Sequence, residues 1–377
     1  MQLPYAEELN IGYLSRLFDN TTNCYKFFWF QAILHKLDSD HSRFTFDELI
    51  NEMIADAWYM VTEYHLRLGP LGITDNLEEV VKYIYKTYNF ASSEKREKIV
   101  AFLEISDDVK IKKYKSDLTL NVPYRLQVPF YDEIKIGKGM WSGSKQNLTN
   151  EINRQRRLMY YFMMISGLGT VIEVDTAWAE YMVKHKEILK CWTQLRLIQY
   201  LQNKNPSVPG IADKIEPPVA RDIERVRKYW RLIIQVDPSL HDIYGDVDLS
   251  NQTISVDHFV PWQYVAHDEL WNLHPTTCSI NSTKHNFLPS WEVYFGRFSD
   301  IEFRAYRLIY ENEMVSKKFN KIAPYHLNNQ EIRNQLYVDG LSEVDFKTRL
   351  NHIIRPVYES AKNCGFREWI YSIENSV

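Results

Sequence analysis

Cysteine is scarce in this 377-residue sequence, and the few cysteines are not grouped in closely spaced pairs. Its four cysteines lie far apart, with no Cys-x-x-Cys pair among them: Cys24, Cys191, Cys278 and Cys364. A structural zinc ribbon needs such pairs, and a disulfide framework needs a dense set of cysteines. We therefore expect no structural zinc and no disulfide framework, and we place the chain in the reducing cytoplasm.

Targeting and membrane-spanning segments are also missing from the sequence. The first ten residues, MQLPYAEELN, have neither a basic region nor an apolar core, so we expect no signal peptide. The longest nearly apolar run covers residues 160–172 and is too short to cross a bilayer. We see no internal repeats and no low-complexity tract. The sequence thus predicts a globular chain with no membrane partner.

Net charge is small, at −4, but it is unevenly distributed. The net charge is −4 over residues 1–140, +5 over residues 141–240 and −5 over residues 241–377. The total argues against a protein that coats nucleic acid through bulk charge, and it leaves a local basic surface open. Hydrophobic residues make up 45% of the chain, enough for two or three packed units or for one core with large helical additions.

The first 105 residues show the period of amphipathic helices. Residues 46–57 place apolar side chains on one helical face, and Thr45 with Glu48 forms a capping-box pattern at its start. Residues 23–37 and 77–90 are similar and more aromatic. From 106 to 150 the helical period is lost, and an alternation broken by Pro123 and Pro129 predicts short strands and loops.

Helical patterns resume at about residue 148 and continue through residue 166, then again over residues 177–202. A connector with four prolines covers residues 203–218. It leads into a segment with an apolar stripe at spacings of three and four residues, opposite a basic face formed by Arg221, Arg225, Lys228 and Arg231. On pattern alone, a solvated polar face and a nucleic-acid-facing surface are equally good interpretations.

Residues 243–290 combine a β-type pattern with a short polar set. Residues 243–262 predict two short extended pieces around the turn DLSNQ, the second ended by Pro261. We expect an irregular loop over residues 263–279, carrying Asn272, and then a short helix ended by Pro289. On that helix Asn281, Lys284 and His285 share one face. The predicted order is strand, strand, helix.

This segment resembles the HNH endonuclease motif, the ββα-metal fold. The resemblance rests on Asp257-His258 followed by Phe259-Val260-Pro261, on Asn272-Leu273 about fifteen residues later, and on the run from Asn281 to Lys284. The separations resemble those in the HNH domain of the RNA-guided CRISPR nuclease, and DHFVPW and NSTKHNFLP are typical of stand-alone bacterial HNH proteins. The resemblance covers about one-eighth of the chain.

The resemblance implies a role for each polar residue of the set. His258 is implied as the general base, and Asn272 as the residue that braces the loop and orients His258. Asp257 and Asn281 are implied as ligands of Mg²⁺ or Mn²⁺, since both offer hard oxygens. Lys284 is expected to contact a phosphate, and His285 to do the same or to replace a ligand.

Each of these residues also has an ordinary structural interpretation. An isolated Asp-His pair is common, Asn272 alone suits a turn, Asn281 alone suits a helix N-cap, and Lys284 alone suits the surface. The combination in order, at the family's spacing, favours the nuclease interpretation. Without the zinc staple of many HNH domains, the fold must depend on apolar packing, for which the candidates are Phe259, Trp262, Trp271, Leu273, Ile280, Phe287 and Leu288.

The sequence therefore predicts an α+β, mostly α-helical protein with an embedded ββα catalytic unit. We expect an N-terminal helical domain with short strands at its end (1–140), a basic helical region (141–235), the HNH unit (236–295) and a C-terminal helical region (296–377). The expected function is a metal-dependent DNA endonuclease. Basic residues at 154–157, at 221–231, and Lys317, Lys318 and Lys321 are candidates for contacting the DNA backbone.

Several alternatives stay open at this stage. A non-catalytic nucleic-acid-binding or scaffold protein could keep the HNH fold, and an RNA-directed nuclease could use the same residues. The helical flanks suggest recognition, regulation or docking of an activating partner protein. Analogy with stand-alone bacterial HNH proteins suggests restriction or anti-phage defence, although a fold alone does not establish such a role.

Overall fold

The computed structural model describes residues 2–131, 136, 138–155, 157–216 and 223–372. These residues divide into two compact units, each described here by itself. Unit 1 comprises residues 2–206 with 215–216, and unit 2 comprises residues 207–214 with 223–372. The expected regions 236–295 and 296–377 both fall in unit 2, whereas 141–235 is divided between the units. The predicted α+β, mainly helical class is confirmed.

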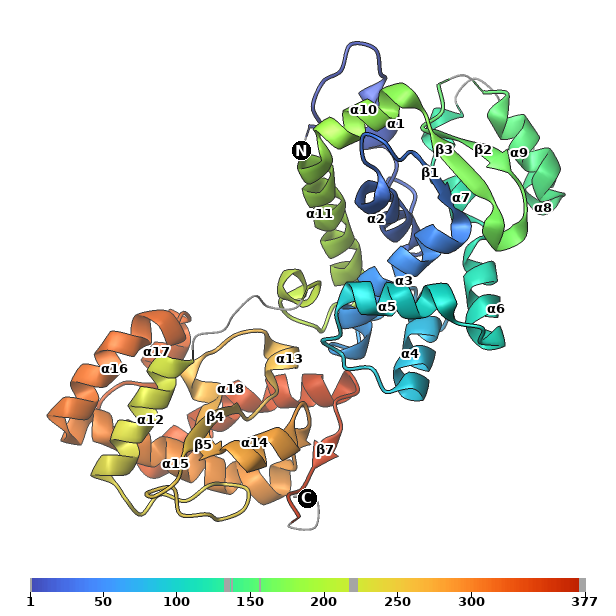
Figure 1. The fold of residues 1–377 in the computed structure, drawn as a ribbon. Helices are drawn as coiled ribbons and strands as arrows, with labels where there is room; N and C mark the ends of the chain where they lie inside the picture. Colours follow the sequence, from blue (N-terminus) through green and yellow to red (C-terminus); the bar gives the residue numbers. More distant parts are fainter. Residues whose placement is uncertain (1, 132–135, 137, 156, 217–222, 373–377) are drawn as a thin grey trace. The chain divides into compact units, whose positions relative to one another are not determined.

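Unit 1 is a helical unit with one small antiparallel sheet (Figure 1). The sheet has the strand order β1-β3-β2, formed by β1 (Arg43–Thr45), β2 (Tyr160–Met164) and β3 (Val171–Val174). The helices are α1 (Ile11–Ser15), α2 (Tyr25–Lys36), α3 (Phe46–Thr62), α4 (Asn76–Tyr88), α5 (Arg96–Ile105), α6 (Val109–Leu118), α7 (Val122–Arg125), α8 (Lys138–Ser142), α9 (Lys145–Asn153), α10 (Thr176–Lys184) and α11 (Lys186–Lys204).

The start of α3 follows the sequence pattern. The hydroxyl of Thr45 accepts a hydrogen bond from the backbone N–H of Glu48 at 3.1 Å, and the Glu48 carboxylate accepts one from the backbone N–H of Thr45 at 2.7 Å. This is the predicted capping box, which satisfies two donors that a helix start leaves unpaired. The apolar face that follows it is buried.

Two predictions about secondary structure in unit 1 are wrong. The described part of residues 106–150 forms short helices instead of strands, because Pro123 and Pro129 stand in first helical turns, where the fixed φ of proline is favourable. The helix expected through residue 166 ends at Asn153, and residues 160–164 form β2 instead. There Tyr160 and Phe162 are buried while Met163 and Met164 are exposed, so the aromatic alternation decides the structure.

A cluster of charged side chains joins three helices of unit 1. Arg96 of α5 donates from Nε to Oδ1 of Asp56 at 2.9 Å, contacts Nδ1 of His35 at 2.7 Å and forms an ion pair with Glu52. Burial raises the pKa of Asp56 to about 6, although Arg96 opposes this shift. Burial, together with Arg96, lowers the pKa of His35 to about 4. These two shifts act on stability in opposite directions.

The two shifts predict opposite pH dependences for two variants. Asp56 has a folded pKa above the unfolded value of about 3.9, so its contribution to stability is full at pH 4 and is lost as the pH rises through about 6. His35 has a folded pKa below the unfolded value of about 6.5, so stability falls as the pH drops toward 4. The difference in free energy of unfolding between variant and wild type should rise with pH for Asp56→Asn and fall for His35→Gln, each by roughly 2–3 kcal/mol.

Urea unfolding at several pH values between 4.5 and 7 measures both differences against the wild-type chain. Glu94→Gln is a suitable control, since it removes a carboxylate of α5's N-terminal flank that pairs with Lys98 and lies outside the cluster. Parallel pH profiles for all three variants and the wild type would show that neither pKa shift acts on stability.

Unit 2 is built around a two-stranded antiparallel sheet, β4 (Ile254–His258) and β5 (Leu273–Thr277) (Figure 1). A second pair, β6 (Leu288–Pro289) and β7 (Glu368–Trp369), is parallel. The helices are α12 (Glu224–Val236), α13 (Trp262–Val265), α14 (Cys278–Lys284), α15 (Trp291–Glu311), α16 (Glu313–His326), α17 (Gln330–Leu336) and α18 (Glu343–Asn363). The helices α12, α14 and α15 all contact the β4–β5 sheet.

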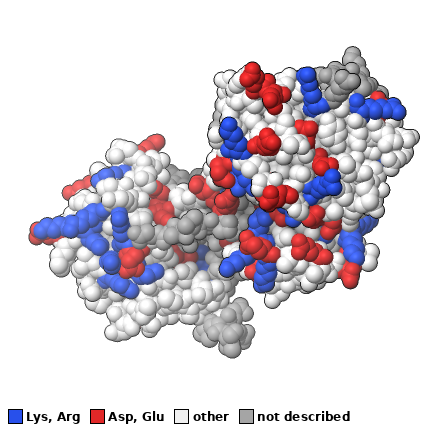
Figure 2. All heavy atoms as spheres, turned by 45° about the horizontal axis from the view of Figure 1, so that its top comes forward, with Lys and Arg blue, Asp and Glu red and all other residues white. Residues whose placement is uncertain are grey.

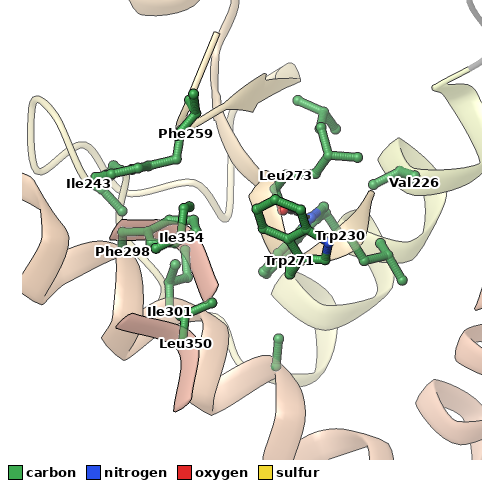
Figure 3. Packing of buried hydrophobic residues seen from close by; sticks show 14 of the residues in the cluster. Val226, Trp230, Ile243, Phe259, Trp271, Leu273, Phe298, Ile301, Leu350 and Ile354 are labelled. Atoms are coloured by element: carbon green, nitrogen blue, oxygen red, sulfur yellow. Dashed lines mark hydrogen bonds between the residues drawn. The ribbon is translucent and has the colours of Figure 1, made fainter. Parts of the chain in front are cut away.

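Apolar packing holds the sheet of unit 2 against its helices. Phe259, directly after β4, stacks on Phe298 of α15 with ring centroids 4.4 Å apart, and Figure 3 shows both rings in the core. On the other side, Trp230 of α12 donates from Nε1 to the carbonyl of Leu273 at 3.1 Å. The predicted core residues of the HNH segment are buried with one exception, Phe287, which is 40% exposed. The prediction for Phe287 is therefore wrong; it lies in the turn between α14 and β6, where its N–H donates to the carbonyl of Lys284 at 3.0 Å.

Candidate active site

The sheet that carries the site pairs β4 with β5, and its register places Asp257 opposite His274 and His258 opposite Leu273. The expectation that the two strands lie within residues 243–262 is therefore wrong. The first expected piece forms no strand; an isolated bridge joins His241 and Asp248 on either side of it, and β5 comes from the expected loop. Pro275 is tolerated in β5, since each strand of a two-stranded sheet has an open edge. The order strand, strand, helix is kept, because α14 follows β5 directly.

Helix α14 begins earlier than expected. Its N-cap is Thr277, whose hydroxyl accepts a hydrogen bond from the N–H of Ile280 at 3.3 Å. Asn281 therefore lies inside the helix and is not its cap. Because α14 contacts both strands, the side chains of Asn281 and Lys284 face β4.

Asn272 fixes the backbone just beyond β4. Its amide oxygen accepts from the N–H of Val260 at 2.7 Å, and its amide nitrogen donates to the carbonyl of Val260 at 2.8 Å. The carbonyl of Asn272 also accepts from the N–H of Phe259 at 2.9 Å. Asn272 is fully buried, so these bonds have no competition from water. The two ends of the 259–272 loop are thereby tied together next to His258.

Asp257 lies in a buried hydrogen-bond network. Its Oδ2 accepts from the hydroxyl of Tyr244 at 2.6 Å and lies 3.5 Å from Nε2 of His274, and Lys284 Nζ lies 3.2 Å from Oδ1 and 3.0 Å from Oδ2. Burial by itself would raise the pKa of the Asp257 carboxyl. The charge of Lys284 and the hydrogen bonds from His274 and Tyr244 outweigh burial and hold the pKa well below its usual range. Asp257 is therefore an ionised carboxylate at neutral pH.

Lys284 does not lie where the sequence interpretation placed it. It is fully buried, and besides Asp257 it donates to the carbonyl of His258 at 2.8 Å. A side chain with no exposed surface cannot contact a phosphate from solvent in this arrangement. Lys284 instead neutralises Asp257 and holds the end of β4 against α14.

His258 is paired with a carboxylate that the motif does not include. Its Nε2 lies 2.8 Å from Oδ1 of Asp268, in the loop between α13 and β5. A carboxylate oxygen can only accept, so at this distance Nε2 carries the ring proton. Nδ1 is then the ring nitrogen with a lone pair, the atom that can accept a proton from water.

Asn281 lies beside the strand that ends in Asp257 and His258. Its amide nitrogen donates to the hydroxyl of Ser255 at 2.7 Å and lies 3.4 Å from the carbonyl of Val256. Within the described part of the chain, its amide oxygen makes no hydrogen bond. That oxygen therefore keeps its lone pairs for another partner.

The remaining predicted residues lie outside this network. His285 is exposed and caps α14 with a positive φ of 47°. Arg225 and Lys228 are exposed on α12, Arg225 with its guanidinium 4.1 Å from the ring centroid of Tyr325. Lys228 and Arg231 both lie 3.9 Å from Glu224. Arg221 lies outside the described residues.

Three functional candidates were missed by sequence reasoning: Tyr244, Asp268 and His274. His274 could have been found, since it stands next to Leu273 in the motif and alternation along β5 points it toward Asp257. Asp268 has no comparable signal, since it is one of two adjacent acidic residues in an irregular loop. Tyr244 is remote in sequence and becomes a partner of Asp257 only through the fold.

Comparison with protein families agrees with this geometry. Residues 242–290 match the model of the HNH endonuclease family. The chain thus carries an HNH endonuclease domain. The match begins at Asp242, beside Tyr244, and ends after β6, so it includes β4, β5 and α14. A search of curated proteins finds no match, and neither does a search of solved structures.

The match over residues 242–290 supports a nuclease activity and nucleic acid as a partner at the coarse level of the family. The HNH domain makes up only part of unit 2, and the helices α12 and α15 to α18 lie outside the match. Within the described residues, no helix is both long and apolar enough to cross a bilayer.

The HNH donor set is compatible with a hard divalent ion. Asp257 supplies an ionised carboxylate, and Asn281 supplies an amide oxygen without a hydrogen bond. Among the described residues, no three His, Cys, Asp or Glu side chains converge as a ligand group. An ion here would have to complete its shell with water and substrate oxygens, as Mg²⁺ commonly does.

Proposed function

We propose that unit 2 is a metal-dependent endonuclease that hydrolyses phosphodiester bonds of DNA, with His258 as general base. The observation that carries this proposal is the pairing of His258 Nε2 with Asp268 at 2.8 Å, directly beside the ionised Asp257. A histidine oriented by a carboxylate is the arrangement by which proteins prepare an imidazole to remove a proton.

The motif residues and Asp268 each have a role in the proposed reaction. Asp268 holds the proton on Nε2, so that Nδ1 of His258 accepts the proton of the attacking water. Asn272 fixes the backbone that follows His258. Lys284 keeps Asp257 ionised. Asp257 and Asn281 would hold Mg²⁺ or Mn²⁺, whose positive charge, when bound, stabilises the developing charge on the 3′-oxygen leaving group.

The basic surface of unit 2 supports DNA as the substrate. The helices α12 and α16 contact each other and carry exposed Arg225, Lys228, Lys317 and Lys321, with Lys318 half-buried beside them. On the face shown in Figure 2, Lys and Arg side chains gather at the end of unit 2 where Figure 1 places α16. Such a surface attracts the phosphate backbone without reading sequence. We expect exposed His285 to contribute a phosphate contact near the site.

Substrate and ion requirements test this proposal directly. The purified chain is incubated with supercoiled plasmid, linear duplex, single-stranded DNA and RNA, in Mg²⁺, Mn²⁺ or chelator. We expect DNA cutting that needs the ion, gives 5′-phosphate ends that ligate without kinase treatment, and is absent with His258→Ala. Cutting restricted to RNA would favour the RNA-directed nuclease instead. Binding of DNA without cutting under any ion would favour a non-catalytic scaffold.

A role in restriction or anti-phage defence is a separate part of the proposal, drawn from the likeness to stand-alone bacterial HNH proteins. Plaque counts on cells expressing the wild-type chain or His258→Ala test it. Equal plaque counts on both strains would contradict this role and leave the nuclease proposal untouched. A partner protein that activates the nuclease should co-purify with the wild-type chain and with His258→Ala alike.

A further inference from the structure

The junction between α16 and α17 binds the loop that carries Asp268. Nδ1 of His326, the last residue of α16, lies 2.8 Å from the carbonyl oxygen of Asp268. Two residues later, Asn328 donates to the carboxylate of Glu269 from its backbone N–H at 3.1 and 3.2 Å and from its amide nitrogen at 2.8 Å. Two consecutive loop residues, Asp268 and Glu269, are thus held by two residues of the C-terminal region.

These contacts are sheltered from solvent. His326 is 5% exposed and Glu269 is 8% exposed. A buried carboxylate without donors is costly, and Asn328 provides three hydrogen bonds to Glu269. Since the carbonyl of Asp268 can only accept, His326 must carry its proton on Nδ1, and its buried Nε2 makes no hydrogen bond with the described residues. Among the described residues, the Asp268 carbonyl is thus the hydrogen-bond partner of the His326 ring, which is placed to hold the loop.

The loop held in this way has little regular structure of its own. It lies between α13 and the short 3-10 helix Leu270–Asn272, and Ala266 at its start has a positive φ of 53°. At the far end, the N–H of Asn272 donates to the carbonyl of Glu269 at 3.1 Å, which links the loop to the residue that braces Val260. Fixing Asp268 and Glu269 therefore fixes both the partner of His258 and the turn that ends in Asn272.

We propose that His326 and Asn328 are positioning residues for the HNH site, which hold the loop so that Asp268 stays paired with His258. This rests on the proposed nuclease function. The α16–α17 junction lies outside the family match, and under this proposal it helps to position the catalytic residues. The C-terminal helices then complete the active site in addition to covering the core.

The test uses the full-length chain with His326→Leu, His326→Gln and Asn328→Ala. Asn334→Ala is the matched control, because Asn334 is exposed on α17 and its side chain accepts a hydrogen bond from Gln330 at 2.8 Å, away from the loop. In plasmid cleavage we expect His326→Leu and Asn328→Ala to lower kcat about 10- to 100-fold with KM within about 2-fold of wild type, since small displacements of a catalytic group have effects of this size. Glutamine keeps a donor toward Asp268, so His326→Gln should retain most activity, and Asn334→Ala should be unchanged.

A second measurement needs no cleavage at all. With ¹⁵N-labelled histidine, the proton on His258 Nε2 should give a downfield resonance that is absent in His258→Ala. The resonance should persist in Asn334→Ala and His326→Gln, and move or broaden in His326→Leu and Asn328→Ala. Folding is checked by thermal unfolding, and Asn328→Ala serves alone if His326→Leu does not fold.

The two measurements separate the two proposals. A wild-type chain that cuts no nucleic acid but shows a resonance sensitive to Asn328→Ala contradicts the nuclease function and keeps the positioning role of the junction. Folded His326→Leu and Asn328→Ala proteins with an unchanged resonance overturn the positioning role, whether or not kcat falls.

Discussion

Replacing His258 by alanine should lower the rate of metal-dependent DNA cleavage by about 10²- to 10⁴-fold, the range expected for losing a general base. The same change should leave DNA affinity almost unchanged, because His258 is 6% exposed and the basic residues of α12 and α16 are untouched. Asp268→Asn should give a smaller loss of about 10- to 100-fold, since the imidazole stays but can adopt the other tautomer. The two losses should not add, because both residues act through one proton transfer.

Single-turnover cleavage of supercoiled plasmid measures these rates, and a gel shift in chelator measures affinity. Asp246→Asn is a suitable control, because Asp246 is an exposed acidic residue of the HNH segment that pairs with His241 and not with the site. A His258→Ala protein that still cuts at the wild-type rate would remove His258 from the mechanism. An Asp268→Asn protein as active as wild type would leave the base without its proposed partner.

The parts of the fold that sequence predicted well are those with local causes. The capping box of Thr45 and Glu48 depends on two residues three positions apart, and it appears as predicted. The motif residues from Asp257 to Lys284 are also close in sequence, so their meeting on β4 and α14 follows from two neighbouring strands, the loop between them and one helix. The failed prediction at β2 concerns a strand whose sheet has a distant member: β3, the hairpin partner of β2, pairs on its other edge with β1 from the start of the chain.

At the site, too, the sequence predicts what depends on local residue types and misses what depends on the three-dimensional fold. The residue types of the HNH motif can be read from sequence, but burial cannot. Lysine is nearly always exposed, so an exposed, phosphate-binding Lys284 is the natural prediction. The structure instead closes α14 over β4 and buries Lys284 against Asp257. Asp268 could not be chosen over neighbouring Glu269 from sequence, because only the fold turns the first toward His258 and the second toward Asn328.

Lys284→Met should destabilise unit 2 by about 3–5 kcal/mol, because it leaves the buried carboxylate of Asp257 without its counter-charge. If Lys284 served only as a surface contact to phosphate, Lys284→Met would change the free energy of unfolding by no more than about 0.5 kcal/mol. It would instead raise the KM for DNA cleavage. Urea unfolding measures the difference, in chelator so that no bound ion contributes. Because the chain divides into two compact units, Trp fluorescence is followed together with circular dichroism to test whether unfolding is two-state.

A double-mutant cycle with Asp257→Asn completes the measurement. Asparagine keeps the size of Asp257 and removes its charge, so Asp257→Asn with Lys284→Met should regain most of the stability that Lys284→Met loses, with a coupling energy of at least about 3 kcal/mol. Additive losses would mean that the two side chains do not interact, and the buried ion pair would then not be what keeps Asp257 ionised. A coupled pair assigns Lys284 to the interior of the HNH domain, where it sets the charge of the carboxylate proposed to hold the ion. Contact with the DNA backbone is then left to the exposed basic residues of α12 and α16.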